Sequence, residues 1–99
     1  MHLSGFNVGQ DQAEAIALKA LEFLVSNEEI LTVFLGSTGA SVSDLRSGAS
    51  DAAFLGSVLD FILMDDQWVI KLCDACDLNY SEIYPARHAL PGGEQVNWT

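Results

Sequence analysis

Basic residues are scarce in this sequence. Four Lys and Arg side chains stand against 14 Asp and Glu, so the formal net charge is −10. A surface of this sign repels the phosphates of nucleic acids and anionic lipids, and it favours solubility or contact with basic partners. We therefore do not expect binding to nucleic acid or to a membrane, and plain solubility explains the charge more simply than a specific basic partner.

Long apolar runs are missing as well. No run is longer than Phe61–Met64, which falls far short of the ~20 residues that cross a bilayer. The opening stretch MHLSGFNVG has neither the basic start nor the apolar centre of a signal peptide. These observations predict a chain without a membrane segment, located in the cytoplasm.

The sequence also lacks the signs of a disulfide-rich or β-sheet protein. Two cysteines in 99 residues do not make a disulfide framework. No stretch of useful length alternates apolar and polar residues with the period of two that half-buried strands show. A hydrophobic content of 49% is well above the disordered range, and this length suits one domain with its own core. We predict a single helical domain over residues 10–90, between mobile tails at 1–9 and 91–99.

Helical periodicity is what the sequence has in abundance. Apolar residues at spacings of three and four form continuous stripes, as on the buried face of a helix. Leu59 lies in the middle of one such stripe and is expected to be buried. The pattern predicts an all-α protein, a compact orthogonal bundle with a central fourth helix. The six predicted helices lie near residues 10–26, 28–38, 42–48, 51–64, 66–77 and 80–89.

One pattern occurs twice. The stretch ALEFLVSNEEILTVFL begins at Ala20, and VLDFILMDDQWVIKLC begins 38 residues later at Val58. At this offset Leu21 matches Leu59, and most other apolar positions keep their class. Two tandem repeats resembling helix-turn-helix units would produce the match, although any two amphipathic helical hairpins would align to some degree.

Capping residues mark the predicted helix boundaries. Ser41–Asp44 and Asn79–Glu82 are both capping boxes, in which a side chain and a backbone amide bond reciprocally across three residues. Gly39 suits a left-handed helix end, where a Cβ atom is disfavoured. We expect side-chain caps on the second, fourth and fifth helices from Asn27, Ser50 and Asp65.

The motif CDAC, Cys73–Cys76, is the first candidate for chemistry. A redox pair needs a helix start, where the dipole lowers the thiol pKa, but this pair closes a predicted helix. As half of a zinc site it lacks a second pair, and His88 is the one nearby partner. Buried core cysteines are therefore the favoured interpretation, with metal binding and redox chemistry as alternatives.

The two predicted hairpins resemble DNA-binding helix-turn-helix motifs in outline. A DNA reader needs Lys and Arg on its recognition helix, whereas these helices offer Arg46 in one and Arg87 with His88 in the other. Asp44 and Glu82 offset these charges. A structural use of the motif is favoured over nucleic-acid recognition.

Aromatic and basic side chains cluster on the last helix, at Tyr80, Tyr84, Arg87 and His88. They could line a small site, but a partly exposed amphipathic face is the favoured interpretation. No nucleophile elbow, phosphate-binding loop or zinc-protease motif is present. The sequence therefore predicts no catalytic, cofactor-binding or metal-binding residue, and no cofactor.

The first helix holds more apolar residues than its buried stripe needs. Leu18 and Val25 stand roughly 110–130° from the centre of the stripe, at ~100° per residue. We predict that both border an exposed patch used for self-association or for a partner helix. The alternative is that both pack under the last helix or a tail.

Four stretches, AEAIALKALEFL, TGASVSDLR, AAFLGSVLDFIL and ARHALPGG, resemble a family of small proteobacterial proteins known as a domain of unknown function. The resemblance covers about four-fifths of the chain, from about Gln12 to Gly93. It implies a bacterial, cytoplasmic, all-α and non-enzymatic protein, and it supplies no functional residue.

Three hypotheses for function follow. The leading one is a non-enzymatic protein-interaction or structural module, with a protein partner or self-association. The second is a degenerate helix-turn-helix regulator that binds nucleic acid. The third is an enzyme whose site the sequence does not reveal.

Overall fold

The computed structural model describes residues 9–91, so the predicted tails lie outside the described residues except for Gly9 and Pro91. It confirms an all-α bundle with six helices in this part of the chain. The helices are α1 (Gln10–Ser26), α2 (Glu28–Thr38), α3 (Val42–Gly48), α4 (Ala52–Leu63), α5 (Asp66–Cys76) and α6 (Tyr80–His88). Their bounds agree with the predicted ones to within one residue. None of the helices in residues 9–91 is both long and apolar enough to cross a bilayer.

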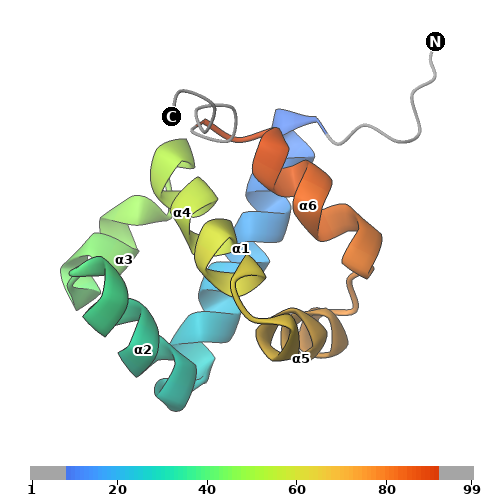
Figure 1. The fold of residues 1–99 in the computed structure, drawn as a ribbon. Helices are drawn as coiled ribbons and strands as arrows, with labels where there is room; N and C mark the ends of the chain where they lie inside the picture. The colour runs from blue at the N-terminus through green and yellow to red at the C-terminus, as the bar shows by residue number, and fades with distance from the viewer. Residues whose placement is uncertain (1–8, 92–99) are drawn as a thin grey trace, which may run out of the picture.

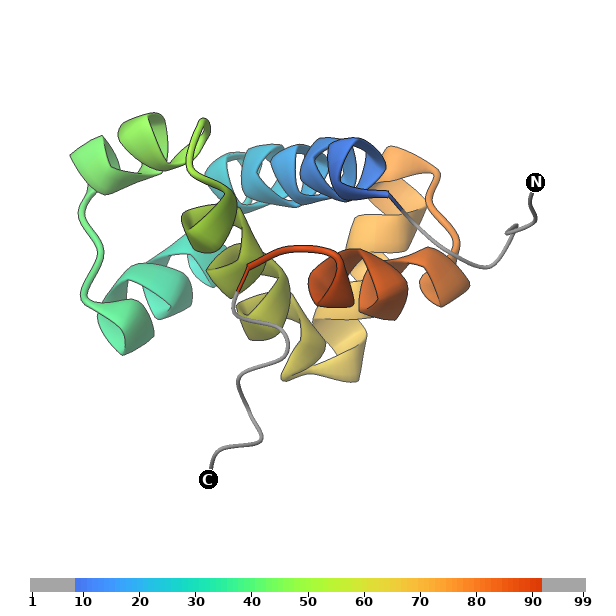
Figure 2. The ribbon, with the colours of Figure 1, turned by 90° about the horizontal axis from the view of Figure 1, so that it is seen from above.

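Helices α1 and α4 form the centre of the bundle. They pack against each other, with α2 and α3 on one side and α5 and α6 on the other (Figures 1 and 2). Helix α6 packs against both central helices, whereas α3 packs mainly against α4. The central position predicted for the fourth helix is therefore confirmed, and α1 shares it.

The core lies where the apolar stripes of the helices meet. Leu59 is fully buried, as predicted from its place in the stripe of α4. Aromatic rings link the second helix of each repeat to the centre: Phe61 of α4 lies 5.1 Å from Phe34 of α2 and 4.5 Å from Trp68 of α5, measured between ring centroids. Helices α2 and α5, which lie on opposite sides of the centre, thus both pack their aromatic rings against α4.

The predicted capping boxes form. The amide of Ser41 donates to Asp44 Oδ2 at 2.9 Å, and the amide of Asp44 donates to Ser41 Oγ at 3.3 Å. At the start of α6 the amide of Asn79 donates to Glu82 Oε1 at 3.2 Å. Gly39 ends α2 in the left-handed region at φ 76°, where a side chain would be strained.

Two predicted caps need correction. Helix α4 is capped by Asp51, whose Oδ1 accepts from the Ala53 amide at 3.0 Å. Ser50 instead donates its hydroxyl to the Ser47 carbonyl at 3.4 Å, because it belongs to the turn that ends α3. Asn27 precedes α2 but makes no side-chain cap hydrogen bond. The predicted cap at Asp65 is confirmed.

The backbone repeats at the offset seen in the sequence. The bounds of α2, Glu28–Thr38, become those of α5, Asp66–Cys76, when 38 is added to each residue number. The starts of α3 and α6 also differ by 38, and so do the two residues with left-handed backbone, Gly39 and Asp77. The chain therefore builds two helical units of the same local design.

Candidate functional site: two equivalent grooves

Leu18 and Val25, the residues predicted to border an interaction surface, lie in one groove. The groove runs between α1, α2 and α3 and has a volume of about 540 Å³. Leu18 is 36% exposed and Val25 is 54% exposed, and no residue of the last helix lines this groove. The tails, the other predicted cover for these two residues, lie outside the described residues. Val42, from the start of α3, is 59% exposed and completes the apolar lining above the buried Leu45.

Two charged residues of opposite sign line the same groove. Glu22 comes from α1 and Arg46 from α3, and both are exposed. Neither side chain makes an ion pair within residues 9–91. The groove thus offers an apolar stripe with one free carboxylate and one free guanidinium at its border.

A second groove lies at the corresponding place of the second repeat, between α4, α5 and α6. Its volume is about 550 Å³. Five residues of the first groove have their counterparts, 38 positions later, in the second. These pairs are Val25 and Leu63, Leu31 and Val69, Val42 and Tyr80, Leu45 and Ile83, and Arg46 and Tyr84. The sequence pattern singled out Tyr80 and Tyr84 of this groove but did not predict the groove itself, although the offset of 38 applied to Val25 points to it.

The exposed apolar side chains gather in these two grooves. Eight large hydrophobic residues of the described chain are exposed. Three of them line the first groove and three line the second, namely Leu18, Val25 and Val42, and Ile70, Tyr80 and Tyr84. Val33 and Met64 lie outside both grooves. Scattered single apolar residues need no explanation, so the grouping singles out the two grooves as the candidate functional site.

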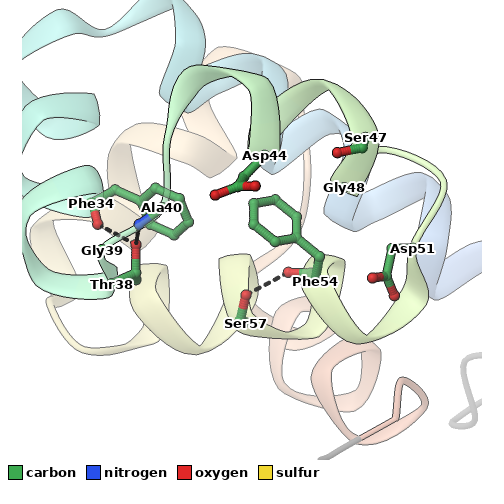
Figure 3. A pocket seen from close by; sticks show the side chains of 10 residues that line it. All are labelled: Phe34, Thr38, Gly39, Ala40, Asp44, Ser47, Gly48, Asp51, Phe54 and Ser57. Carbon is green, nitrogen blue, oxygen red and sulfur yellow. Dashed lines mark hydrogen bonds between the residues drawn. The ribbon is translucent and has the colours of Figure 1, made fainter.

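A third cleft, of about 460 Å³, lies between the α2–α3 turn and α4 (Figure 3). Its aromatic residues are Phe34 and Phe54, which meet edge to face at 6.1 Å between ring centroids. Its carboxylates serve the helix starts, Asp44 through the Ser41 amide and Asp51 through the Ala53 amide. Both acidic residues of the cleft therefore have a structural role as helix caps.

The hydroxyl groups of this cleft are also engaged. Thr38 donates to the Phe34 carbonyl at 2.7 Å, and Ser57 donates to the Phe54 carbonyl at 2.6 Å (Figure 3). Gly48 lies against the Phe54 ring, and a Cβ atom there would overlap it. Aromatic packing and helix termini thus explain this cleft.

The cysteines of the CDAC motif sit at the end of α5. Cys73 is buried in the core and Cys76 is half-buried, and both are free thiols. Burial raises the pKa of the Cys73 thiol, and the negative charges of Asp74 and Glu82 add to the rise. Burial also raises the pKa of Cys76. Both thiols are therefore held in the less reactive protonated form.

The residues singled out on the last helix do not form one cluster. Tyr80, Tyr84 and His88 are exposed, and the Tyr84 and His88 rings meet edge to face at 5.5 Å. Arg87 is buried on another face, where Nε and Nη2 donate to Asp60 at 2.6 and 2.9 Å. Four residues so close in sequence point to two faces because a helix turns ~100° per residue.

Arg87 also closes the end of α6. Its Nη1 donates to the carbonyls of Leu90 and Pro91 at 3.5 and 3.2 Å. Arg87 is therefore not available to contact DNA phosphates. Arg46, the arginine of the other predicted helix-turn-helix unit, lines the first groove. No group of three or more His, Cys, Asp or Glu residues within 9–91 is placed to hold a metal ion.

Comparison with known proteins gives a family but no characterised relative. No curated protein and no solved structure matches the chain. The family described as "Protein of unknown function (DUF3572)" matches residues 10–93, which include all six helices and both grooves. The chain therefore belongs to this family.

Proposed function

We propose that this protein is a non-enzymatic, cytoplasmic module that binds a partner protein through the groove of α1, α2 and α3. The observation that carries the proposal is the convergence of Leu18, Val25 and Val42 from two helices on one open apolar groove. A groove of this kind suits the apolar face of a partner helix. The two free thiols agree with a reducing compartment.

The border of the groove supports a partner of different sequence over a second copy. Glu22 and Arg46 are available for charged residues of the partner, which would fix its orientation. Two copies of this chain would each bring a formal charge of −10 to the contact. Their mutual repulsion opposes self-association, whereas a partner with neutral or basic flanks meets no such opposition.

Site-specific photo-crosslinking in the source cells tests this proposal. A photoreactive residue at position 18 should link to one defined protein, and Val25→Glu in the same chain should abolish the link. Val33→Glu is the matched control, since Val33 is an exposed helical valine outside the groove. The purified partner should then bind the wild type and the control but bind Val25→Glu at least tenfold more weakly.

Three results would overturn the proposal. The first is the same cross-linked protein with Val25→Glu as with Val33→Glu. The second is a link from position 18 to another copy of the chain, supported by dimerisation in sedimentation. The third is a partner that binds the purified Val25→Glu variant as tightly as the wild type.

A further inference from the structure

The second groove gathers the two tyrosines of the described chain, both of which are exposed. Tyr80 is 56% exposed and Tyr84 is 63% exposed, and both line the groove between α4, α5 and α6. They lie about one turn apart on α6, because they are four positions apart in sequence. Ile70, 37% exposed, faces the same space from α5, and the buried Ile83 contributes to its lining.

The charge of this groove differs from that of the first. Asp66 is the one charged residue that lines it, and within residues 9–91 it makes no ion pair. The position that holds Arg46 in the first groove holds Tyr84 in the second. An aromatic ring thus takes the place of a positive side chain, in a groove that also holds a free carboxylate. The whole chain has a formal charge of −10.

This combination is suited to a cation with an apolar stem. The face of a tyrosine ring attracts Lys and Arg through its negative quadrupole, and a carboxylate attracts the same groups. The apolar walls can cover the methylene stem that such side chains carry. An anionic ligand, by contrast, would lose its hydration beside Asp66 without gaining a basic partner in the groove.

From this charge complementarity we propose that the groove of α4, α5 and α6 is a second interaction surface, which takes a Lys or Arg side chain from a basic segment of another protein. The tyrosines lie along the bound side chain, and Asp66 pairs with its charge. Tyrosine suits such a role because it gives a large contact area at low entropic cost. The proposal concerns different residues from those of the first groove and does not depend on it.

A titration with defined peptides tests the proposal. The probe is the acetylated and amidated peptide (Leu-Arg)₃, added to isotope-labelled full-length protein and followed by amide chemical shifts. The matched control peptide contains citrulline, the neutral isostere of arginine. We expect shifts concentrated at Asp66, Ile70, Tyr80 and Tyr84, and binding at least tenfold weaker for the citrulline peptide.

Two pairs of variants separate this site from general attraction to an acidic surface. Asp66→Asn should weaken binding of the arginine peptide about tenfold, whereas Asp74→Asn, which removes the same charge from the same helix outside the groove, should change it less than twofold. Tyr84→Ala should weaken binding similarly, and Met64→Ala, which removes an exposed side chain outside the groove, should not. Melting temperatures confirm that each variant is folded.

Several outcomes would overturn the proposal. Equal effects of Asp66→Asn and Asp74→Asn would show diffuse electrostatic binding. Equal affinity for the citrulline peptide would exclude recognition of the cation. Shifts at Tyr80 and Tyr84 that depend on protein concentration without peptide would assign the groove to a second copy of the chain. Absence of shifts at millimolar peptide would exclude the site altogether.

Discussion

The two grooves are built from equivalent positions and have nearly equal volumes, yet three positions that line the first groove do not line the second. Leu18, Glu22 and Ala49 all line the first groove. Adding 38 to their numbers gives Gly56, Asp60 and Arg87. In the second repeat these three residues contact one another instead of lining a groove.

Arg87 is the reason for the difference. Its guanidinium pairs with Asp60, and a Cβ atom added at Gly56 would lie 2.8 Å from Nη1 and 3.0 Å from the Pro91 carbonyl oxygen. The glycine therefore makes room for the arginine, which ties α6 to α4. In the first repeat the position of Arg87 holds Ala49, which has no charge to pair with Glu22, and both residues line the groove. Equal local design has thus produced two grooves that differ at three positions, where an ion pair of the second repeat takes the place of residues that line the first groove.

The largest expected effect concerns the core that both repeats share. Leu59→Ala should lower the free energy of unfolding by roughly 2–5 kcal/mol, because truncation of a buried leucine loses transfer energy and leaves a cavity. Its counterpart Leu21, also buried, should give a loss in the same range. Denaturant titration measures both. A loss below about 0.5 kcal/mol for Leu59→Ala would contradict its central place in the packing.

Substitutions at two equivalent positions, Gly56 and Leu18, test the role of Gly56. Gly56→Leu gives the second repeat the residue that the first has at Leu18, and it should cost about 2–3 kcal/mol because the side chain displaces Arg87. Leu18→Ala should cost less than about 1 kcal/mol, since Leu18 is partly exposed. Thermal or denaturant unfolding measures both, and the reverse order of effects would contradict the comparison.

The ion pair itself should contribute a smaller amount. Asp60→Asn should lower the free energy of unfolding by about 1 kcal/mol, discounted because the Asp60 side chain is 57% exposed and solvent screens the pair. Glu22→Gln, at the equivalent unpaired position, should stay within about 0.5 kcal/mol. Chemical denaturation of both variants at low and high salt measures these changes in the free energy of unfolding. Equal losses would show that the ion pair does not distinguish the repeats.

The cysteines distinguish the repeats chemically, because their counterparts are Leu35 and Thr38. Both thiols should react slowly with iodoacetamide near neutral pH, because burial raises the pKa of each above its ordinary value. Cys73 should react more slowly than Cys76, because Cys73 is buried and Cys76 is half-buried. The rates should rise as the pH approaches the raised pKa values, because thiolate then forms. Mass spectrometry of the modified protein measures them, and fast labelling of Cys73 in the folded protein at pH 7 would contradict this.

The smallest effect is expected with DNA. Arg46 lines the first groove, and Arg87 forms an ion pair with Asp60. A net charge of −10 also opposes DNA binding, which is driven by the release of counterions around basic residues. Fluorescence anisotropy with duplex DNA at physiological salt should show no binding. Salt-sensitive binding below micromolar concentration would instead support a helix-turn-helix regulator.

The amino-acid sequence by itself determined the local structure. Apolar spacing set the helices, and Ser41, Gly39 and Asp65 mark boundaries where the structure has them. The interactions involved join residues within about four positions of each other, so they can be recognised from neighbours alone. The misplaced cap at Ser50 shows the limit of this reasoning, since two adjacent residues can both cap and the backbone of the preceding turn selects one of them.

Tertiary structure decided what the two repeats can do. The sequence placed Leu18 and Val25 off the buried stripe of the first helix, but it could not say whether another helix would pack over them. It grouped Arg87 with Tyr80 and Tyr84, whereas Asp60, 27 residues away in sequence, draws the arginine inward. Such choices depend on side chains that meet after the helices pack, and on whether a residue such as Gly56 leaves space between them. The periodicity of a single helix contains no information about either.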